Sequence, residues 1–251
     1  MIEIRNLRKV YDDKIAVHEL NLSIKAGEVF AFLGPNGAGK TTTIKILAGL
    51  LRPTSGNAIV GGFDLATDGL QARALMSYVP DEPYLYEKLT AYEFLRMIGD
   101  LYGLSRERIE TRIGQVVEQF ELGSFLDNLT ESYSHGMKQR TVIAAALLHE
   151  PRLLVVDEPM VGLDPKSART VKDTLKQLSR EQGVTVFMST HTLSVAEEVA
   201  DRVGILNDGR MVALGTMEEM RQMSTSRGIE GHRRLEDLFL DLTQSNGNGE
   251  V

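Results

Sequence analysis

The chain has 251 residues, a size that one hydrophobic core, or one core with an inserted subdomain, can organise. Its composition, 42% hydrophobic and 25% charged, excludes a disordered or fibrous protein. The net charge of -7, from 28 Lys and Arg against 35 Asp and Glu, disfavours a general nucleic-acid binder, so we expect no nucleic-acid partner. The absence of cysteine excludes disulfides and thiolate metal sites.

Membrane insertion and export are not expected. The longest aliphatic run, Val142 to Leu148, is far shorter than the ~20 residues that cross a bilayer. The first residues lack the pattern of a signal peptide. We therefore expect the chain to stay in the compartment where it is made and to cross no membrane by itself.

Strand-like and helical segments alternate along the chain. Residues 20–24 alternate apolar and polar side chains with period two, and short apolar runs recur at 29–33, 57–62, 153–156, 184–188 and 203–206. Predicted helices at 42–51, 165–180 and 193–199 separate several of these runs. Buried strands between helices predict an α/β fold with a mostly parallel core sheet.

Helical periodicity dominates from about residue 88 to residue 150, which we interpret as an inserted helical subdomain. We assign residues 1–222 to one domain that contains this insertion. Residues 223–251 are predicted to form a C-terminal linker, a short amphipathic helix and a frayed tail. The apolar face of that helix consists of Leu235, Leu238, Phe239 and Leu242.

A glycine-rich segment follows the predicted strand at 29–33. It fits the pattern G-x-x-x-x-G-K-[ST] and consists of Gly34, Pro35, Asn36, Gly37, Ala38, Gly39, Lys40 and Thr41, followed by Thr42. Glycines let backbone N–H groups approach phosphate oxygens, and the following helix directs its positive end at the same anion. Lys40 is expected to contact the β- and γ-phosphates and Thr41 to bind Mg²⁺. The alternative is a glycine turn without a ligand.

Two acids end the predicted strand at 153–156, at the sheet edge where such folds bind ligands. Asp157 suits Mg²⁺, and Glu158 suits polarising the attacking water, so Glu158 is a predicted catalytic residue together with Lys40. His191 follows another apolar strand and is expected to reach the same edge, near the γ-phosphate. Considered alone, the acid pair would more often cap the next helix, and a solitary histidine is more often structural.

With these motifs in place, residues 1–214 resemble the ATP-binding subunit of an ABC transporter. Tyr11 matches the aromatic residue on which that family stacks adenine. Ser134 and Gly136 match the family signature Leu-Ser-Gly-Gly-Gln, in which Tyr133, His135 and Met137 here replace Leu, the first Gly and Gln. Asp164 lies in the loop 161–165 that matches the family's dimer-facing loop, and His191 matches its switch histidine.

Asp81 occupies the position of the family's glutamine, which senses Mg²⁺ and the membrane partner. An acid there still offers an oxygen to Mg²⁺, although it is one methylene shorter and adds charge. Some exporter-type subunits are similar in this acid and in a relaxed signature. The resemblance therefore implies an ABC-2-like exporter subtype.

The resemblance implies a P-loop NTPase fold with an N-terminal antiparallel β subdomain besides the parallel core and the helical insertion. It also implies ATPase activity with Mg²⁺ as cofactor, in a head-to-tail dimer with a second, identical or different, ABC ATPase subunit. There Ser134, Gly136 and Asp164 would complete the site of the other chain. Integral membrane permease subunits are the other implied partners, contacted by the helical block and residues 81–89. That arrangement would place the chain in the cytoplasm, peripheral to the cell membrane.

Two other functions compete with this interpretation. A soluble ABC ATPase acting on ribosomes or DNA usually fuses two cassettes or carries a long coiled-coil insertion, and this chain has neither. A non-catalytic regulatory cassette would lack the acid at Glu158, which is present.

Overall fold

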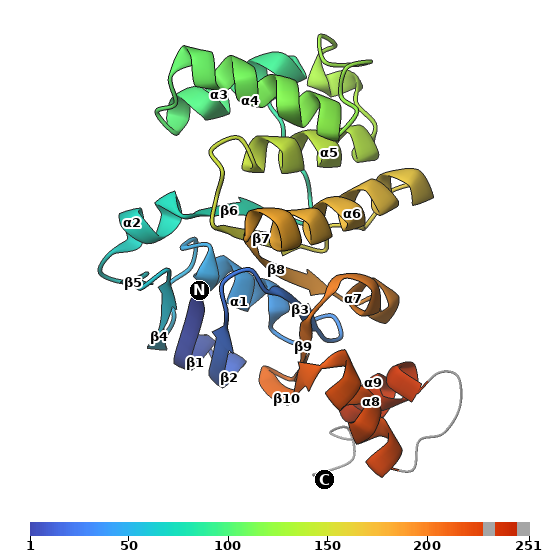
Figure 1. Ribbon diagram of the computed structural model, residues 1–251. Helices are drawn as coiled ribbons and strands as arrows, with labels where there is room; N and C mark the ends of the chain where they lie inside the picture. The colour runs from blue at the N-terminus through green and yellow to red at the C-terminus, as the bar shows by residue number, and fades with distance from the viewer. Residues whose placement is uncertain (228–233, 245–251) are drawn as a thin grey trace.

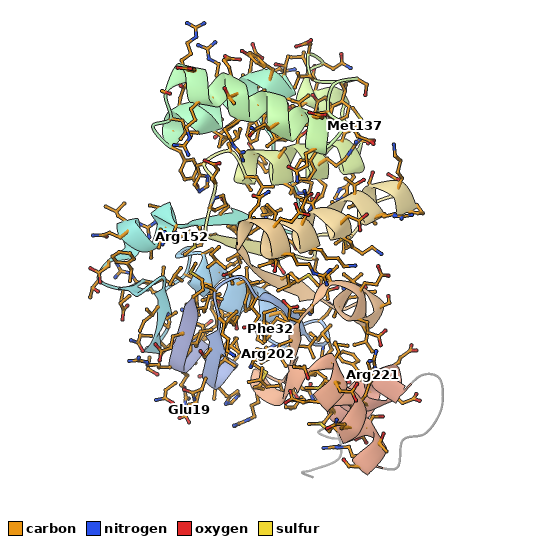
Figure 2. All side chains as sticks on the ribbon, viewed as in Figure 1. Glu19, Phe32, Met137, Arg152, Arg202 and Arg221 are labelled. Carbon is orange, nitrogen blue, oxygen red and sulfur yellow. The ribbon has the colours of Figure 1, made fainter. Side chains whose placement is uncertain are left out.

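The structure is a computed structural model of the chain, and it describes residues 1–227 and 234–244. Two sheets face each other across helix α1 (Lys40–Leu47), and helices cover the far face of the larger sheet (Figure 1). Side chains fill the space between these layers, with Phe32 in the interior (Figure 2).

The smaller sheet is antiparallel and has the order β2-β1-β4-β5. Its strands are β1 (Ile2–Tyr11), β2 (Lys14–Ile24), β4 (Ser55–Val60) and β5 (Phe63–Asp64). Alternate side chains of β1 and β2, such as Ile4 and Leu22, are buried in the same cluster as Ile44 of α1. The expected N-terminal antiparallel subdomain is therefore present, and it buries one face against α1.

The larger sheet has the order β10-β9-β3-β8-β7-β6 in the described residues, and all of its pairings except β9 with β10 are parallel. Its strands are β3 (Val29–Leu33), β6 (Met76–Val79), β7 (Leu153–Asp157), β8 (Thr185–Thr190), β9 (Arg202–Asn207) and β10 (Arg210–Thr216). Phe30 and Phe32 face α1, where both rings lie within 5.6 Å of the Phe187 ring, measured between centroids. The intervening Ala31 faces the helices on the other side. The predicted mostly parallel core is confirmed.

A helical subdomain is inserted between the neighbouring strands β6 and β7 (Figure 1). It contains α3 (Ala91–Leu101), α4 (Arg106–Gln119), a short 3-10 turn at Thr130–Ser132 and α5 (His135–Ala146). Hydroxyls begin all three α-helices: Thr90, Ser105 and Ser134 each accept a hydrogen bond from the third residue of the helix. No helix in residues 1–227 and 234–244 combines the length and the apolar character needed to cross a bilayer.

Helices also cover the core itself. Helix α2 (Gly69–Ala74) precedes β6, while α6 (Pro165–Gln182) and α7 (Leu193–Val199) follow β7 and β8. The observed α6 and α7 agree with the predicted helices. Helix α1 differs from its prediction, because it begins two residues earlier, directly after Gly39, and ends at Leu47.

The C-terminal division differs from the expected one. The boundary after residue 222 falls inside α8 (Met217–Ser226), so the first residues assigned to a linker are helical. Helix α8 begins with a capping box between Thr216 and Glu219. Helix α9 (Arg234–Gln244) is the predicted amphipathic helix, and it packs against α8 and β9. Buried Asn207 donates hydrogen bonds to the last-turn carbonyls of Leu242 and Thr243. The remaining linker, 228–233, and the tail, 245–251, lie outside the described residues.

His149 joins the helical subdomain to the core sheet. Its ring stacks on Tyr102, which follows α3, with 3.6 Å between centroids. Its Nε2 lies 3.4 Å from the hydroxyl of Ser77 on β6, and its Nδ1 is buried without a hydrogen-bond partner. Burial lowers the pKa of His149 from 6.5 to about 4, and a hydrogen bond to the backbone at Met76 opposes this effect.

This burial predicts a pH dependence of stability. Because the folded pKa is about 4 and the unfolded pKa is 6.5, the unfolded chain takes up the proton first as the pH falls from 6.5 towards 4. Between pH 7 and 5, the free energy of unfolding of the natural protein should fall by about 2 kcal/mol more than that of His149→Phe, which keeps the stacked ring. Urea unfolding at both pH values measures this difference, and an equal loss in the two proteins would contradict it.

Candidate active site

The glycine-rich loop connects β3 to α1 in a conformation that only glycine allows at its ends. At Gly39, φ is +103° and an added Cβ would lie 2.3 Å from the carbonyl oxygen of Ala16. At Gly34, an added Cβ would lie 2.4 Å from the carbonyl oxygen of Leu206. The two glycines therefore let the loop fold tightly over β2 and β9, at the N-terminus of α1.

Lys40, the first residue of α1, is buried inside this loop. Its ammonium donates hydrogen bonds to the carbonyls of Gly34 (2.7 Å) and Pro35 (3.2 Å). It lies 3.9 Å from Oε1 of Glu158. Burial lowers the pKa of Lys40, while the charges of Glu158 and Asp157 oppose that effect. The ammonium is held where the loop and the acids of β7 meet.

Asp157, the last residue of β7, is fully buried. Its Oδ1 accepts a hydrogen bond from the hydroxyl of Ser189 on β8, and its Oδ2 has no partner at hydrogen-bond distance. Burial raises the pKa of this carboxyl, and so do the charges of Asp81 and Glu158, whereas the hydroxyls of Ser189 and Thr41 lower it. A buried carboxylate oxygen without a partner fits a cation as its missing neighbour.

Glu158 is held in a left-handed backbone conformation with φ of +47°. Its N–H points at Ser189, 3.1 Å from the hydroxyl and 3.2 Å from the carbonyl oxygen. Its carboxylate lies between two cationic or donor groups, with Oε2 3.0 Å from Nδ1 of His191 and Oε1 facing Lys40. The backbone N–H of His191 also donates to Oε2, at 3.3 Å. Strained backbone at such a position is typical of functional sites.

A cleft of about 360 Å³ opens over these groups. Tyr11 lines it, is 44% exposed and has the ammonium of Lys9 4.9 Å from its ring centroid. Asp81 and Glu158 also line it. The predicted site residues that line the cleft are Tyr11, Asn36, Gly37, Gly39, Lys40, Thr41, Thr42, Asp81 and Glu158. The structure thus brings most of the predicted ATP contacts into one space.

Ser134, Gly136 and Asp164 lie together elsewhere, at the N-termini of α5 and α6. Ser134 caps α5, and Asp164 caps α6 by accepting from the N–H groups of Lys166 and Ser167. The hydrogen bond from the Ser167 hydroxyl lowers the pKa of Asp164, and the backbone hydrogen bonds lower it further. An added Cβ on Gly136 would lie 3.9 Å from Oδ2 of Asp164. Within the described residues none of the three lines the cleft of its own chain.

Two neighbouring residues are not among the predicted site residues. Ser189 holds both Asp157 and the backbone of Glu158, and His135 in the signature segment places Nε2 3.0 Å from the carbonyl oxygen of Val161. Ser189 is the first polar side chain after a run of apolar residues on β8, which is a signal that the sequence contains. The partner of His135 lies 26 residues away, so no local pattern predicts that contact.

The donors present fit Mg²⁺ rather than a metal held wholly by protein. No group of three or more His, Cys, Asp or Glu suited to a metal exists among residues 1–227 and 234–244. Mg²⁺ in nucleotide sites takes one or two protein oxygens and completes its shell with water and phosphate. Asp157 Oδ2 and the Thr41 hydroxyl are such oxygens.

A phosphate loop on a buried parallel strand, with a lysine inside it and two acids at the end of a nearby strand, defines a P-loop ATPase cassette.

Comparison with known proteins agrees with this class. A sequence model described as ABC transporter matches residues 17–161. The linearmycin resistance ATP-binding protein LnrL of Bacillus subtilis is 41% identical over 220 residues, which are 88% of this chain and 70% of the relative. The probable multidrug ABC transporter ATP-binding protein YbhF of Escherichia coli is 38% identical over 242 residues, 96% of this chain and 41% of YbhF, so the chain spans less than half of that relative.

Solved structures agree in fold. The ATP-binding subunit of an ABC transporter has a TM-score of 0.87 and 34% sequence identity, covering 96% of this chain and 99% of the solved one. The ATP-binding cassette MJ0796, in a dimeric post-hydrolysis state bound to ADP and Pi, has a TM-score of 0.80 and 29% identity over 86% of this chain and 99% of its own. The chain belongs to the ABC transporter family, as an ATP-hydrolysing ATP-binding subunit.

The position of Lys40 leads to a binding prediction. Lys40→Ala should weaken ATP binding by about 10- to 100-fold, because the loop loses its one buried ammonium among the residues described. Isothermal titration calorimetry measures the affinity. Lys45→Ala, on the exposed face of the same helix, is the matched control and should bind ATP as the natural protein does. Unchanged binding by Lys40→Ala would contradict the phosphate loop.

Proposed function

We propose that this chain is the motor subunit of an exporter-type ABC transporter, and that it hydrolyses ATP at an interface with a second ATPase subunit. One observation carries the proposal. The carboxylate of Glu158, which lines the cleft, is held between Lys40 in the phosphate loop and His191 after β8. This arrangement supports hydrolysis at the phosphate end of a bound nucleotide.

The cleft supports one orientation of ATP. Tyr11 offers an exposed ring on which adenine would stack, and the loop 34–42 offers backbone N–H groups and the ammonium of Lys40 to the phosphates. The Thr41 hydroxyl and Asp157 Oδ2 would hold Mg²⁺, with Asp81 as a further oxygen beside them. When bound, Mg²⁺ would neutralise charge that develops on the phosphate oxygens.

Glu158 and His191 would act on the attacking water. With Nδ1 of His191 against Oε2, the Nε2 atom of the ring would face the attacking water and orient it. Oε1 remains available to accept a hydrogen bond from that water and polarise it. The left-handed backbone at Glu158 and the hydrogen bonds from its N–H to Ser189 hold the carboxylate in this position before the substrate arrives.

Ser134, Gly136 and Asp164 would serve the site of the other subunit. They share one surface at the N-termini of α5 and α6, where helix N–H groups favour an anion, and they are absent from the cleft of their own chain as described. The related cassette MJ0796 is dimeric in its structure with ADP and Pi. A head-to-tail dimer would place this surface over the γ-phosphate of the partner's ATP.

An exposed aromatic patch supports contact with membrane-spanning subunits. Tyr84 and Tyr86 are 73% and 51% exposed and lie edge to face, 5.8 Å apart, whereas Leu85 between them is buried in the core. This segment follows Asp81 and precedes α3, so a partner bound there could transmit its state to the cleft. The relatives LnrL and YbhF are named for resistance and multidrug transport, which supports export as the direction.

Substitution of the proposed catalytic acid tests hydrolysis. Glu158→Gln keeps the shape of the side chain but loses its basicity, so ATP should still bind while turnover falls by about 100-fold or more. Phosphate release measures the rate. Glu118→Gln, an exposed position on α4, serves as the control and should hydrolyse normally. Undiminished hydrolysis by Glu158→Gln would remove the acid from the mechanism.

The same variant tests the shared interface. With ATP, Glu158→Gln should elute as a dimer on a sizing column, and without nucleotide it should elute as a monomer, because the phosphates bridge the two subunits. A tight dimer without nucleotide would point to a different interface.

The aromatic patch is tested by capture from membranes. The tagged chain should co-purify with a polytopic membrane protein from detergent-solubilised membranes, and Tyr84→Ser with Tyr86→Ser should reduce the yield of that protein severalfold without changing ATP affinity. Leu214→Ser, at an exposed apolar position on β10, is the control. Recovery of ribosomes or DNA instead would favour a soluble ABC ATPase.

A further inference from the structure

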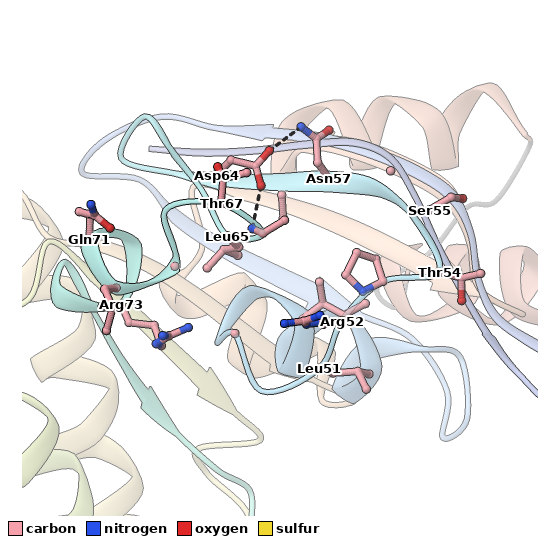
Figure 3. A pocket seen from close by; sticks show the side chains of 18 residues that line it. Leu51, Arg52, Thr54, Ser55, Asn57, Asp64, Leu65, Thr67, Gln71 and Arg73 are labelled. Atoms are coloured by element: carbon pink, nitrogen blue, oxygen red, sulfur yellow. Dashed lines mark hydrogen bonds between the residues drawn. The ribbon is translucent and has the colours of Figure 1, made fainter.

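A second cavity lies at the opposite end of α1 from the nucleotide cleft (Figure 3). Its volume is about 590 Å³, within the range of ~300–1,000 Å³ that holds small molecules. The turn after α1, strand β4 and the segment from β5 into α2 form its walls. It shares no lining residue with the nucleotide cleft.

Two arginines face each other across this cavity. Arg52 follows α1 and Arg73 lies on α2, and their side chains extend toward one another from opposite walls (Figure 3). Within residues 1–227 and 234–244 neither guanidinium forms an ion pair or a hydrogen bond. Two cations that converge without a counter-charge repel each other, and an anion between them would remove that cost.

Two glycines make room for the Arg73 guanidinium. Its Nη1 atom lies 3.2 Å from where a Cβ would stand on Gly49 and 2.9 Å from where one would stand on Gly69. A side chain at Gly69 would therefore displace the guanidinium from its place in the cavity. Because Gly49 and Gly69 have no side chains, the charge of Arg73 can lie close to the C-terminal end of α1. The negative end of the helix dipole there favours a cation.

The acid in the cavity wall does not neutralise the arginines. Asp64 accepts a hydrogen bond from the side-chain amide of Asn57 (2.9 Å) on Oδ2 and from the N–H of Ala66 (2.8 Å) on Oδ1. These bonds hold the pKa of Asp64 below its usual value, so it is charged but already engaged. With two cations against this one anion, the lining carries a net positive charge.

We propose that this cavity binds the phosphate group of an organic molecule between Arg52 and Arg73. Guanidinium groups match phosphate oxygens as paired, charge-assisted donors. A phosphate dianion balances the charge of two guanidinium groups, whereas a single carboxylate balances only one. The volume far exceeds that of phosphate alone, and Leu51, Pro53 and Leu65 offer apolar contacts to the rest of the ligand. Soluble organic phosphates and phospholipid headgroups share this chemistry.

A local fluorescent reporter tests the proposal, because the chain contains no tryptophan. Leu70 lines the cavity and is 77% exposed, so Leu70→Trp should fold normally and report occupancy there. Titration with inorganic pyrophosphate should give a saturable change in its emission. Leu101→Trp, 75% exposed on α3, is the matched reporter outside the cavity and should show no saturable change.

The arginines are then removed in the Leu70→Trp protein. Arg52→Gln and Arg73→Gln should each weaken the response about tenfold or more, and the double variant should abolish it. Arg180→Gln, an exposed arginine on α6, should leave it unchanged. Thermal melting checks folding, and calorimetric titration of the natural chain and the double variant gives a readout independent of the tryptophan.

Vesicles distinguish the two sources of phosphate. An arginine-dependent response to pyrophosphate, without one to phosphatidylglycerol vesicles, assigns a soluble ligand. An arginine-dependent response to phosphatidylglycerol vesicles that phosphatidylcholine vesicles do not produce assigns a lipid headgroup. No response to either probe, or a response that survives the double substitution, would overturn the proposal.

Discussion

Strand β8 lies between β3 and β7 and pairs in parallel with both, so the carboxyl ends of the three strands meet at one edge of the sheet. Leu33 pairs with Thr190, and Asp157 pairs with Ser189. This register sets the phosphate loop, the acid pair and His191 side by side, although they lie far apart in the sequence. A slip of one residue would turn Asp157 to the other face of the sheet and separate it from the loop.

The same edge concentrates charge where water is scarce. Burial raises the pKa of Asp157 and lowers that of Lys40, and each effect marks a charge that the fold has removed from solvent. Ser189 and the loop carbonyls offset part of this cost through hydrogen bonds. They leave Oδ2 of Asp157 without a partner, which fits the Mg²⁺ that the proposed function would hold there.

The helical insertion shares the buried apolar cluster of the core sheet, and two histidines add polar and stacking contacts between them. The stacked pair of His149 and Tyr102 connects it beside β6, and His135 connects the signature segment to the loop before α6. The latter bond ties Ser134 and Asp164 into one surface. A motion of the insertion would therefore carry the surface that faces a second subunit together with the neighbouring segment 161–164.

Local sequence was sufficient for the phosphate loop, the acid pair and the boundaries of α7, because chain geometry over a few residues dictates each of them. The parallel core was predicted from the alternation of buried strands and helices along the whole chain. Prediction was poorest at the C-terminus, where the Met-rich segment after Gly215 has little periodicity and α8 is held by a cap and by packing on β10 and α9. The sequence also named Tyr11 and Asp81 only through a resemblance, whereas His191 was placed at this edge by the apolar strand before it. Their convergence, the bond of His191 to Glu158 and the placing of Ser134 outside its own cleft depend on strand order and register, which no local pattern contains. The facing arginines 52 and 73 likewise come from separate turns, and only the packing of α2 beside the end of α1 brings their charges to one cavity.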